Sequence, residues 1–326
     1  MFVVLKLQFM KWIFLTLLLW ITQLCVVGQQ SAEQIYQQIP VLHGDSIVFP
    51  LTMVNAFPFI SVEVNGIKGK LMFDTGTESA LRINENVVNL GGRKRERKGY
   101  FGSGQSFDIN TNDTIAEVKF MNGITYRNLL NIRSSNYDFL QKNITPDFIG
   151  YMGYDFFKGY ILKLDYFRRK ITFYKDTEQR KSSKDFLNGE RLLAIINFEL
   201  RSLPNHPIVH VKIGKFDVLG SFDTGQYGLL QLEENAEKTL KANSVVTPAG
   251  KDGYDEELIS LNDIIIDGTF KTTVSGIYPF SFKRSELFRK ALHIEEPSLI
   301  CFGYRFLEQY TTIWDYEGKR IYILEK

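Results

Sequence analysis

The tripeptide Asp-Thr-Gly occurs twice in this chain, each time after an apolar run typical of a strand end. The first copy is Asp74 to Gly76 and the second is Asp223 to Gly225, so the two aspartates are 149 residues apart. A carboxylate placed at the end of an apolar strand costs roughly several kcal/mol of burial unless another group compensates. The repetition therefore predicts that the two carboxylates meet in the folded protein.

The sequence around these copies repeats as well. Pro207 to Ile213 corresponds to Pro58 to Val64 at the same offset, and Gly303 to Ile323 corresponds to Gly153 to Phe173. The last two segments share seven identities in 21 positions, where chance would give about one or two. We interpret the chain as two homologous halves of roughly 130 residues, each forming one lobe.

The local patterns favour strands over helices. Phe59 to Val64 alternates between apolar and polar residues, Asn65-Gly66 is a strong hairpin signal, and Lys70 to Phe73 is the returning strand that leads to the first motif. The aromatic content of 14% also favours a β-rich fold. Short helices are expected at Asn84 to Leu90 and at Glu233 to Lys241. The predicted fold is all-β, with two pseudo-symmetric β-barrel lobes and a cleft between them.

Three further segments lie at the edges of these lobes. Gly99 to Gly104 is a glycine-rich, aromatic hairpin tip, and Gly250 to Tyr254 occupies the same place in the second half. The charged stretch Lys175 to Arg191 is interpreted as the linker. The basic cluster Arg93 to Lys98 is predicted to be a solvated loop, with a nucleic-acid or anionic-surface patch as the alternative.

The composition indicates the class of protein, and the N-terminal residues predict its cellular location. A length of 326 residues with 44% apolar and 23% charged residues fits a globular protein of two domains, and a net charge of +2 gives no case for nucleic acid. Lys6, Lys11 and the apolar stretch from Trp12 to Val27 follow the pattern of a secretory signal. A retained N-terminal anchor is the alternative, although the stretch is short for a membrane span.

The predicted organisation is therefore a signal peptide at 1–28, an N-terminal lobe at 29–180 and a C-terminal lobe at 181–326. Loss of the signal leaves Cys301 as the only cysteine, so no intramolecular disulfide can form. Export without disulfides suits a protein of the bacterial periplasm or cell envelope, or one that is secreted. No stable membrane span is expected after signal cleavage.

Other chemistries have little support in the sequence. The histidines His43, His206, His210 and His293 are scattered and lack the spacing of metal ligands, so core or surface roles are expected and no metal site is predicted. No nucleophile elbow, Walker loop or dinucleotide fingerprint is present. Neither metal nor cofactor is therefore part of the predicted mechanism.

The two motifs and their downstream partners resemble the pepsin and retropepsin superfamily of aspartic peptidases. In that superfamily, each half has an Asp-Thr-Gly and a later hydrophobic-hydrophobic-Gly signature, which here would be Tyr151 to Gly153 and Cys301 to Gly303. The segment Gly150 to Phe157 is similar to the single-lobe retroviral-like domains of bacterial envelope proteins. The second copy departs from the pattern, because Gln226 stands where Thr77 follows the first motif.

The resemblance implies an endopeptidase with an Asp74/Asp223 dyad that activates water. Two carboxyls about 3 Å apart can act as acid and base because they cannot both ionise. The dyad would be supported by a set of motif residues, namely Thr75, Gly76, Thr77, Thr224 and Gly225. A flap over the site would carry Tyr100, Gly102 and Gly104.

The expected partner is a peptide or protein substrate, and both aspartates on one chain imply a monomer. The alternative is a peptide- or glycan-binding protein that has the same fold and no turnover, and Gln226 leaves this alternative open.

Overall fold

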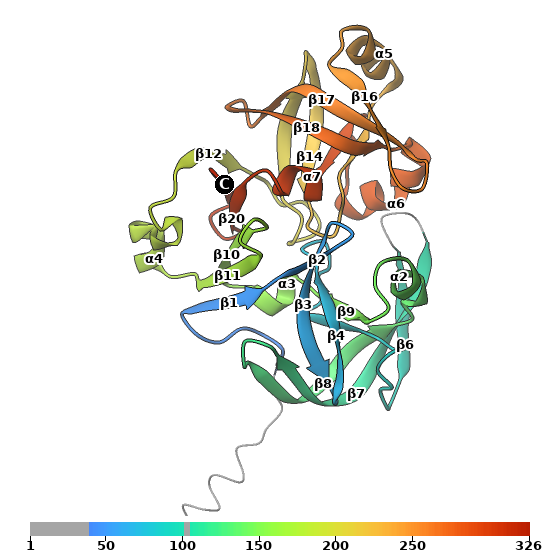
Figure 1. Ribbon diagram of the computed structural model, residues 1–326, viewed down its shortest axis with the longest axis vertical. Coiled ribbons are helices and arrows are strands. Elements are labelled where there is room, and N and C mark those ends of the chain that lie inside the picture. Colours follow the sequence, from blue (N-terminus) through green and yellow to red (C-terminus); the bar gives the residue numbers. More distant parts are fainter. Residues whose placement is uncertain (1–38, 101–104) are drawn as a thin grey trace, which may run out of the picture. The chain divides into compact units, whose positions relative to one another are not determined.

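The computed structural model describes residues 39–100 and 105–326, and these are organised as three β-sheets (Figure 1). Two of the sheets each belong to one half of the chain, and the third takes strands from both halves. The predicted all-β fold with two pseudo-symmetric lobes is confirmed. The predicted signal peptide at 1–28 lies outside the described residues.

The first-half sheet has the strand order β2-β3-β4-β9-β5-β8-β7-β6, and an additional pairing of β3 with β7 curls it into a barrel. The sheet contains β2 (Thr52–Val54), β3 (Phe57–Val64), β4 (Ile67–Phe73), β5 (Leu81–Asn84), β6 (Lys94–Tyr100), β7 (Ser106–Phe120), β8 (Thr125–Ser135) and β9 (Phe148–Met152). Helix α2 (Asp138–Asn143) connects β8 to β9.

The second-half sheet has the order β13-β14-β19-β15-β18-β17-β16, again with an additional pairing, of β13 with β17. The sheet contains β13 (Ile208–Ile213), β14 (Phe216–Phe222), β15 (Leu229–Gln231), β16 (Val246–Lys251), β17 (Glu257–Ile266), β18 (Phe270–Pro279) and β19 (Leu299–Phe302), and it is accompanied by α5 (Glu234–Ala242) and α6 (Phe282–Leu292). Apart from β2, each strand has a counterpart at the same place in the first-half order. The duplication read from the sequence is therefore a duplication of topology.

The third sheet joins the halves in the order β1-β11-β10-β20-β21-β12. Its strands are β1 (Ser46–Pro50), β10 (Tyr160–Asp165), β11 (Lys170–Lys175), β12 (Leu192–Asn197), β20 (Thr311–Asp315) and β21 (Arg320–Leu324), and the short helices α3 (Tyr154–Phe157) and α7 (Tyr304–Leu307) precede β10 and β20. The central pair is β10 with β20, which are equivalent strands of the two repeats and run antiparallel.

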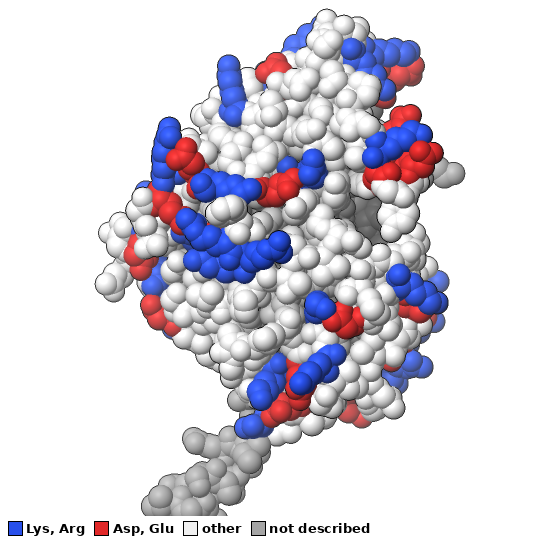
Figure 2. All heavy atoms as spheres, viewed as in Figure 1, with Lys and Arg blue, Asp and Glu red and all other residues white. Residues whose placement is uncertain are grey.

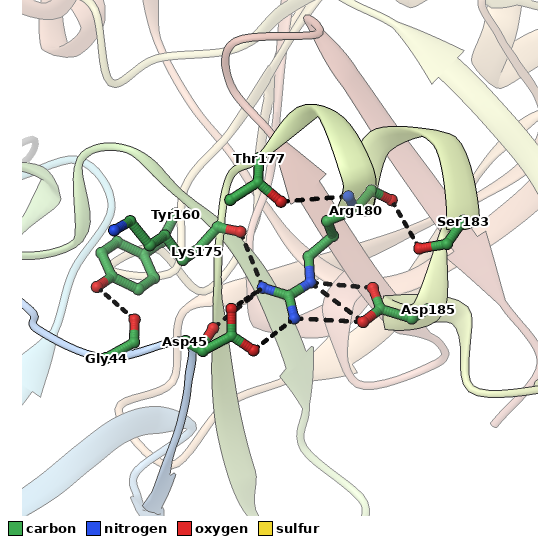
Figure 3. Close-up of polar contacts among 8 residues, drawn as sticks. All are labelled: Gly44, Asp45, Tyr160, Lys175, Thr177, Arg180, Ser183 and Asp185. Carbon is green, nitrogen blue, oxygen red and sulfur yellow. Dashed lines mark hydrogen bonds and ion pairs between the residues drawn. The ribbon is translucent and has the colours of Figure 1, made fainter.

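The segment between the halves is partly helical. It contains α4 (Glu178–Ser183) and the 3-10 helix η1 (Asp185–Leu187), so the predicted lobe boundary at 180/181 falls inside α4. Arg180 of α4 is buried and binds the backbone carbonyls of Asp45 and Lys175 at 3.0 and 2.9 Å (Figure 3). Its guanidinium also pairs with the carboxylates of Asp45 and Asp185, both at 2.9 Å. The start of β1 is thereby tied to the segment that follows β11.

Two local predictions are wrong. Asn84 to Leu90 does not form a helix, because β5 runs to Asn84 and a turn follows in which Asn84 Oδ1 accepts from the Asn86 amide at 3.2 Å. The basic cluster Arg93 to Lys98 is not a loop, because nearly all of it belongs to the edge strand β6. An edge strand can hold successive charges when both of its faces meet solvent, and these side chains are exposed.

The aromatic core lies directly beneath the two motifs. Phe73 and Phe222, the residues that precede the two aspartates, are fully buried. The Phe73 ring lies 5.6 Å from the Phe157 ring, and the Phe222 ring lies 5.5 Å from that of Phe306 and 5.9 Å from that of Trp314. Each motif is thus placed on a rigid aromatic base.

The surface carries charges of both signs. On the face shown in Figure 2, lysine and arginine side chains lie close to aspartate and glutamate side chains in most of the charged areas. No helix within the described residues is long and apolar enough to cross a membrane.

Candidate active site between the two halves

Asp74 and Asp223 each stand one residue beyond the end of a strand, β4 and β14. Each of these strands is paired in parallel with the strand that carries the later signature, β9 and β19 respectively. The Asp74 amide donates to the Met152 carbonyl at 3.0 Å, and the Asp223 amide donates to the Phe302 carbonyl at 3.2 Å. The same local structure therefore presents both carboxylates.

The two carboxylates meet across the boundary between the halves. A Cβ atom added to Gly76 would lie 2.5 Å from Asp223 Oδ2, and one added to Gly225 would lie 2.5 Å from Asp74 Oδ1. The two carboxyl groups are close enough for each to affect the ionisation of the other. Any side chain at the motif glycines would collide with the opposite carboxylate, which explains the need for glycine there.

Backbone and hydroxyl donors hold the carboxylates in place. The Gly76 amide donates to Asp74 Oδ1 and the Gly225 amide donates to Asp223 Oδ1, both at 2.8 Å. Thr77 Oγ1 donates to Asp74 Oδ2 at 2.8 Å. Gln226 has no hydroxyl to offer Asp223 in the same way, so the two carboxyl groups have unequal sets of donors.

The motif threonines join the two halves beneath the carboxylates. The Thr75 amide donates to Thr224 Oγ1 at 3.0 Å, and the Thr224 amide donates to Thr75 Oγ1 at 3.1 Å. Thr224 Oγ1 also donates to the Phe73 carbonyl at 2.9 Å. Both threonines are fully buried, so these bonds act without competition from water.

The environment favours the neutral form of the aspartates. Burial, followed by the negative charge of Asp223, raises the pKa of Asp74 to about 7. Burial also raises the pKa of Asp223 above its ordinary value. The donors from Gly76, Thr77 and Gly225 oppose these shifts. Such a pair titrates as a unit and retains one proton over a range in which isolated aspartates have lost theirs.

Two residues of the site were not predicted from the sequence. Asn205 is fully buried, and its Nδ2 donates to the Thr75 carbonyl at 2.8 Å. His206 is buried next to the first motif, where the Gly76 backbone and the Asp74 charge act on its imidazole. Burial lowers the pKa of His206 to about 4, so the ring is neutral near pH 7. The signal available in the sequence was their place directly before Pro207, the counterpart of Pro58.

A pocket of about 710 Å³ lies next to the second motif. Its apolar and aromatic wall consists of Phe57, Tyr227, Leu229, Tyr278 and Phe280. The tip of the β16–β17 hairpin adds four carboxylates and one lysine, namely Asp252, Asp255, Glu256, Glu257 and Lys251. Gln226, the residue directly after the second motif, lines the same pocket.

The predicted flap is described only in part. Tyr100 is the last residue of β6, pairs with Ser106 of β7 and is exposed. Gly102 and Gly104 lie outside the described residues. Within residues 39–100 and 105–326, no group of three or more His, Cys, Asp or Glu side chains is arranged to hold a metal ion.

Comparisons with known proteins find similar folds among solved structures. No family model and no curated protein sequence matches the chain. Among solved structures, basic 7S globulin from soybean is similar with a TM-score of 0.52 and 10% identity, over 86% of this chain and 95% of that one. The aspartic proteinase from Irpex lacteus is similar with a TM-score of 0.50 and 13% identity, over 86% of this chain and 97% of that one.

These identities are too low to transfer an activity. One structure is named as a proteinase and the other as a globulin, so the likeness does not decide between catalysis and binding. The described chain has the two-lobed fold of pepsin-like aspartic proteinases.

Proposed function

We propose that this protein is an aspartic-type endopeptidase in which Asp74 and Asp223 activate a water molecule. The observation that carries the proposal is that each carboxyl group lies against the glycine of the opposite motif and is held by the amide of its own motif glycine. One buried carboxyl and one half-buried carboxyl held this close together are costly to fold, and a shared proton between them is the chemistry that such a pair provides.

The reaction follows from that shared proton. The ionised carboxylate takes a proton from water while the water oxygen attacks the carbonyl carbon of the peptide. The protonated carboxyl gives its proton to the carbonyl oxygen, which yields a neutral tetrahedral intermediate. The C–N bond then breaks as the nitrogen receives a proton from the carboxyl group that took one from water, while a hydroxyl of the intermediate gives its proton to the other carboxylate. The pair thereby regains its single shared proton. The sequence leaves acid and base interchangeable between Asp74 and Asp223.

An extended peptide is the proposed substrate. Its side chains would enter pockets such as the one beside Gln226, and its backbone would pair with the hairpin that carries Tyr100. In this proposal Gly102 and Gly104 belong to the same flap. Tyr100→Ala is expected to lower kcat/KM without unfolding the protein, and unchanged kinetics would remove Tyr100 from the site.

A mixed peptide library, incubated at several values from pH 3 to pH 8, tests the activity. The wild type should cleave peptides, and both Asp74→Asn and Asp223→Asn should abolish cleavage, because either change removes the shared proton. Cleavage that persists in either variant would contradict the proposed dyad. Mass spectrometry of the products identifies the cleaved bonds.

A non-catalytic peptide- or glycan-binding protein is the second candidate. It is favoured by the loss of one carboxylate donor at Gln226 and by the similarity to a protein named as a globulin. Binding without cleavage by the wild type and both asparagine variants would support it.

We also propose that the mature protein is an exported monomer that lacks residues 1–28, in the bacterial periplasm, the cell envelope or outside the cell. The segment from Gly150 to Phe157 is similar to the retroviral-like domains of bacterial envelope proteins, and this similarity supports the proposed location. Mass analysis of the mature N-terminus and light scattering of the purified protein test it. An intact N-terminus in the mature protein would instead indicate an anchor.

A further inference from the structure

The segment Asn205 to Pro207 contacts the backbone of the first Asp-Thr-Gly motif and of the residue directly before the second. At one end, Asn205 Nδ2 donates to the Thr75 carbonyl at 2.8 Å. At the other end, the Pro207 carbonyl accepts from the Phe222 amide at 3.3 Å, directly before Asp223. Three consecutive residues therefore connect the loop that carries one aspartate to the strand that carries the other.

His206 lies between these two attachments with only 5% of its surface exposed. Its ring packs edge-on against Phe288 of α6, with 5.7 Å between the ring centres. The Gly76 backbone is close enough to act on the imidazole, and among the described residues Nδ1 has no hydrogen-bond partner. The imidazole is therefore held against the first motif in a buried and incompletely satisfied environment.

The first half of the chain lacks this arrangement. At the 149-residue offset, Ala56 corresponds to Asn205 and Phe57 corresponds to His206. Alanine has no side-chain donor, so residue 56 cannot hold Thr224 in the way that Asn205 holds Thr75. Phe57 instead contributes to the apolar wall of the pocket next to Gln226.

The asymmetry needs a reason beyond packing. Burying polar side chains with unsatisfied atoms costs free energy, and neither Asn205 Oδ1 nor His206 Nδ1, both buried, has a partner within residues 39–100 and 105–326. The alanine and phenylalanine of the first half show that this fold accepts an apolar pair at the equivalent place. A polar pair on one side only points to a task at the motif that it touches.

We propose that Asn205 and His206 are positioning residues that hold the Thr75–Gly76 backbone against the Asp223 carboxyl and so set the separation of the two carboxyl groups. Gly76 is the part of the first motif that lies against Asp223 Oδ2, so a small shift of Gly76 moves one carboxyl relative to the other. Because the repulsion between two charges falls with their distance, this separation governs how strongly the pair retains its proton. The catalytic part of the proposal rests on the proposed peptidase function.

The internal repeat supplies the test variants. Asn205→Ala and His206→Phe, made singly and together, give the second half the residues of the first. His206→Gln retains a side-chain N–H and serves as the conservative variant. Arg180→Ala is the control for lost stability, because the Arg180 contacts involve neither motif.

Carbon-13 NMR of labelled aspartate carboxyls, recorded as a function of pH, measures the pKa values of the Asp74/Asp223 pair. The measurement needs no substrate and no catalytic activity. In the wild type, the pair should show a raised upper pKa that disappears in Asp74→Asn. In the double variant the carboxyls separate, so this upper pKa should fall by about half a unit or more. His206→Gln should recover most of the difference from His206→Phe, and Arg180→Ala should titrate like the wild type.

Kinetics on a cleaved peptide give the second measurement. The double variant should lose about tenfold in kcat with KM changed less than about twofold, because misplaced carboxyls weaken the transition state more than they weaken substrate binding. Wild-type titration and wild-type kcat in the folded variants would overturn the positioning role. A wild type that cleaves no peptide would instead refute the proposed function, and the NMR titration would still decide the positioning role.

Discussion

The side-chain hydroxyl oxygens of Thr224 and Thr75 join the two halves through hydrogen bonds. Thr224 Oγ1 accepts from the Thr75 amide and donates to the Phe73 carbonyl, while Thr75 Oγ1 accepts from the Thr224 amide. All three bonds lie in the fully buried region beneath the carboxylates. A serine at position 224 would preserve all three bonds, whereas a valine of nearly the same shape would remove the two that use Thr224 Oγ1.

Thr224→Val is expected to destabilise the protein by about 2–4 kcal/mol, because a buried amide and a buried carbonyl would each lose a partner. Thr224→Ser should lose about 1 kcal/mol or less, as only a methyl group is removed. Urea unfolding monitored by tryptophan fluorescence measures both values. Equal stability of the valine variant and the wild type would show that the threonine bonds contribute little.

Asp74 links the titration of the site to stability. Its pKa is raised to about 7 in the folded protein, above its ordinary value of 3.8, so the folded state binds more protons than the unfolded state between these values. The free energy of unfolding must therefore fall as pH rises through this window. The proton that the chemistry needs is held at the expense of stability near neutral pH.

At pH 7, Asp74→Asn should consequently increase the free energy of unfolding by an amount on the order of a few kcal/mol. The Tm of the variant should therefore be higher than that of the wild type. The difference should shrink toward pH 3, where the wild-type carboxyl is protonated in both states. Scanning calorimetry at pH 3, 5 and 7 gives the comparison. A difference that does not change with pH would contradict the raised pKa.

At the scale of elements, some strands and helices were predicted correctly from the sequence and others were not, and each outcome has a physical reason. The strand and turn leading to Asp74 and the helix near Glu233 were predictable, because each has a clear periodicity and local turn chemistry. The helix predicted at Asn84 to Leu90 was wrong, because the buried Asn84 side chain binds the Tyr137 amide and the Phe148 carbonyl, both distant in sequence. Local propensity contains no information about such partners.

The Arg180 clamp is another element-scale feature that the sequence conceals (Figure 3). A charged stretch between two lobes is typical of a flexible linker, yet Arg180 is buried with four polar groups around its guanidinium. The Tyr174 ring lies 5.3 Å from the guanidinium carbon and covers it from one side. The stretch is thereby anchored to the edge of the shared sheet.

Arg180→Ala should lower stability by about 1–3 kcal/mol, because the carbonyls of Asp45 and Lys175 lose their donor. Arg180→Lys should recover only part of this, since one ammonium cannot reach both carbonyls and both carboxylates. Peptide cleavage per folded molecule should remain unchanged in either variant. Guanidinium chloride unfolding with a parallel activity assay separates the two effects, and an unchanged unfolding midpoint would rule out the clamp.

At the scale of the molecule, the equivalent hairpins of the two halves carry opposite charges. Strand β6 displays Lys94, Arg95, Arg97 and Lys98, whereas the tip of the β16–β17 hairpin displays four carboxylates and one lysine. The acidic tip borders the pocket next to the second motif, and the pocket has an aromatic wall that suits the apolar stem of a long side chain.

If the proposed peptidase activity holds, peptides that place arginine or lysine in this pocket should be cleaved more efficiently than peptides that place glutamate there. The expected difference in kcat/KM is about 3–10-fold, which corresponds to the free energy of an exposed ion pair. The preference should weaken at high salt. The double variant Glu256→Gln with Glu257→Gln should reduce it, whereas the same change at the remote Glu178 should not. A preference for glutamate would show that the acidic tip does not face the substrate.

The sequence by itself determined the duplication, the β-rich two-lobed fold and the two aspartates that come together, because each follows from a repeated local pattern. The tertiary structure alone decided which residues surround those aspartates. Asn205 and His206 reach the first motif from the opposite half, and their place before Pro207 does not by itself indicate that contact. A repeat predicts what the halves have in common, whereas the contacts that make them different depend on packing between distant segments.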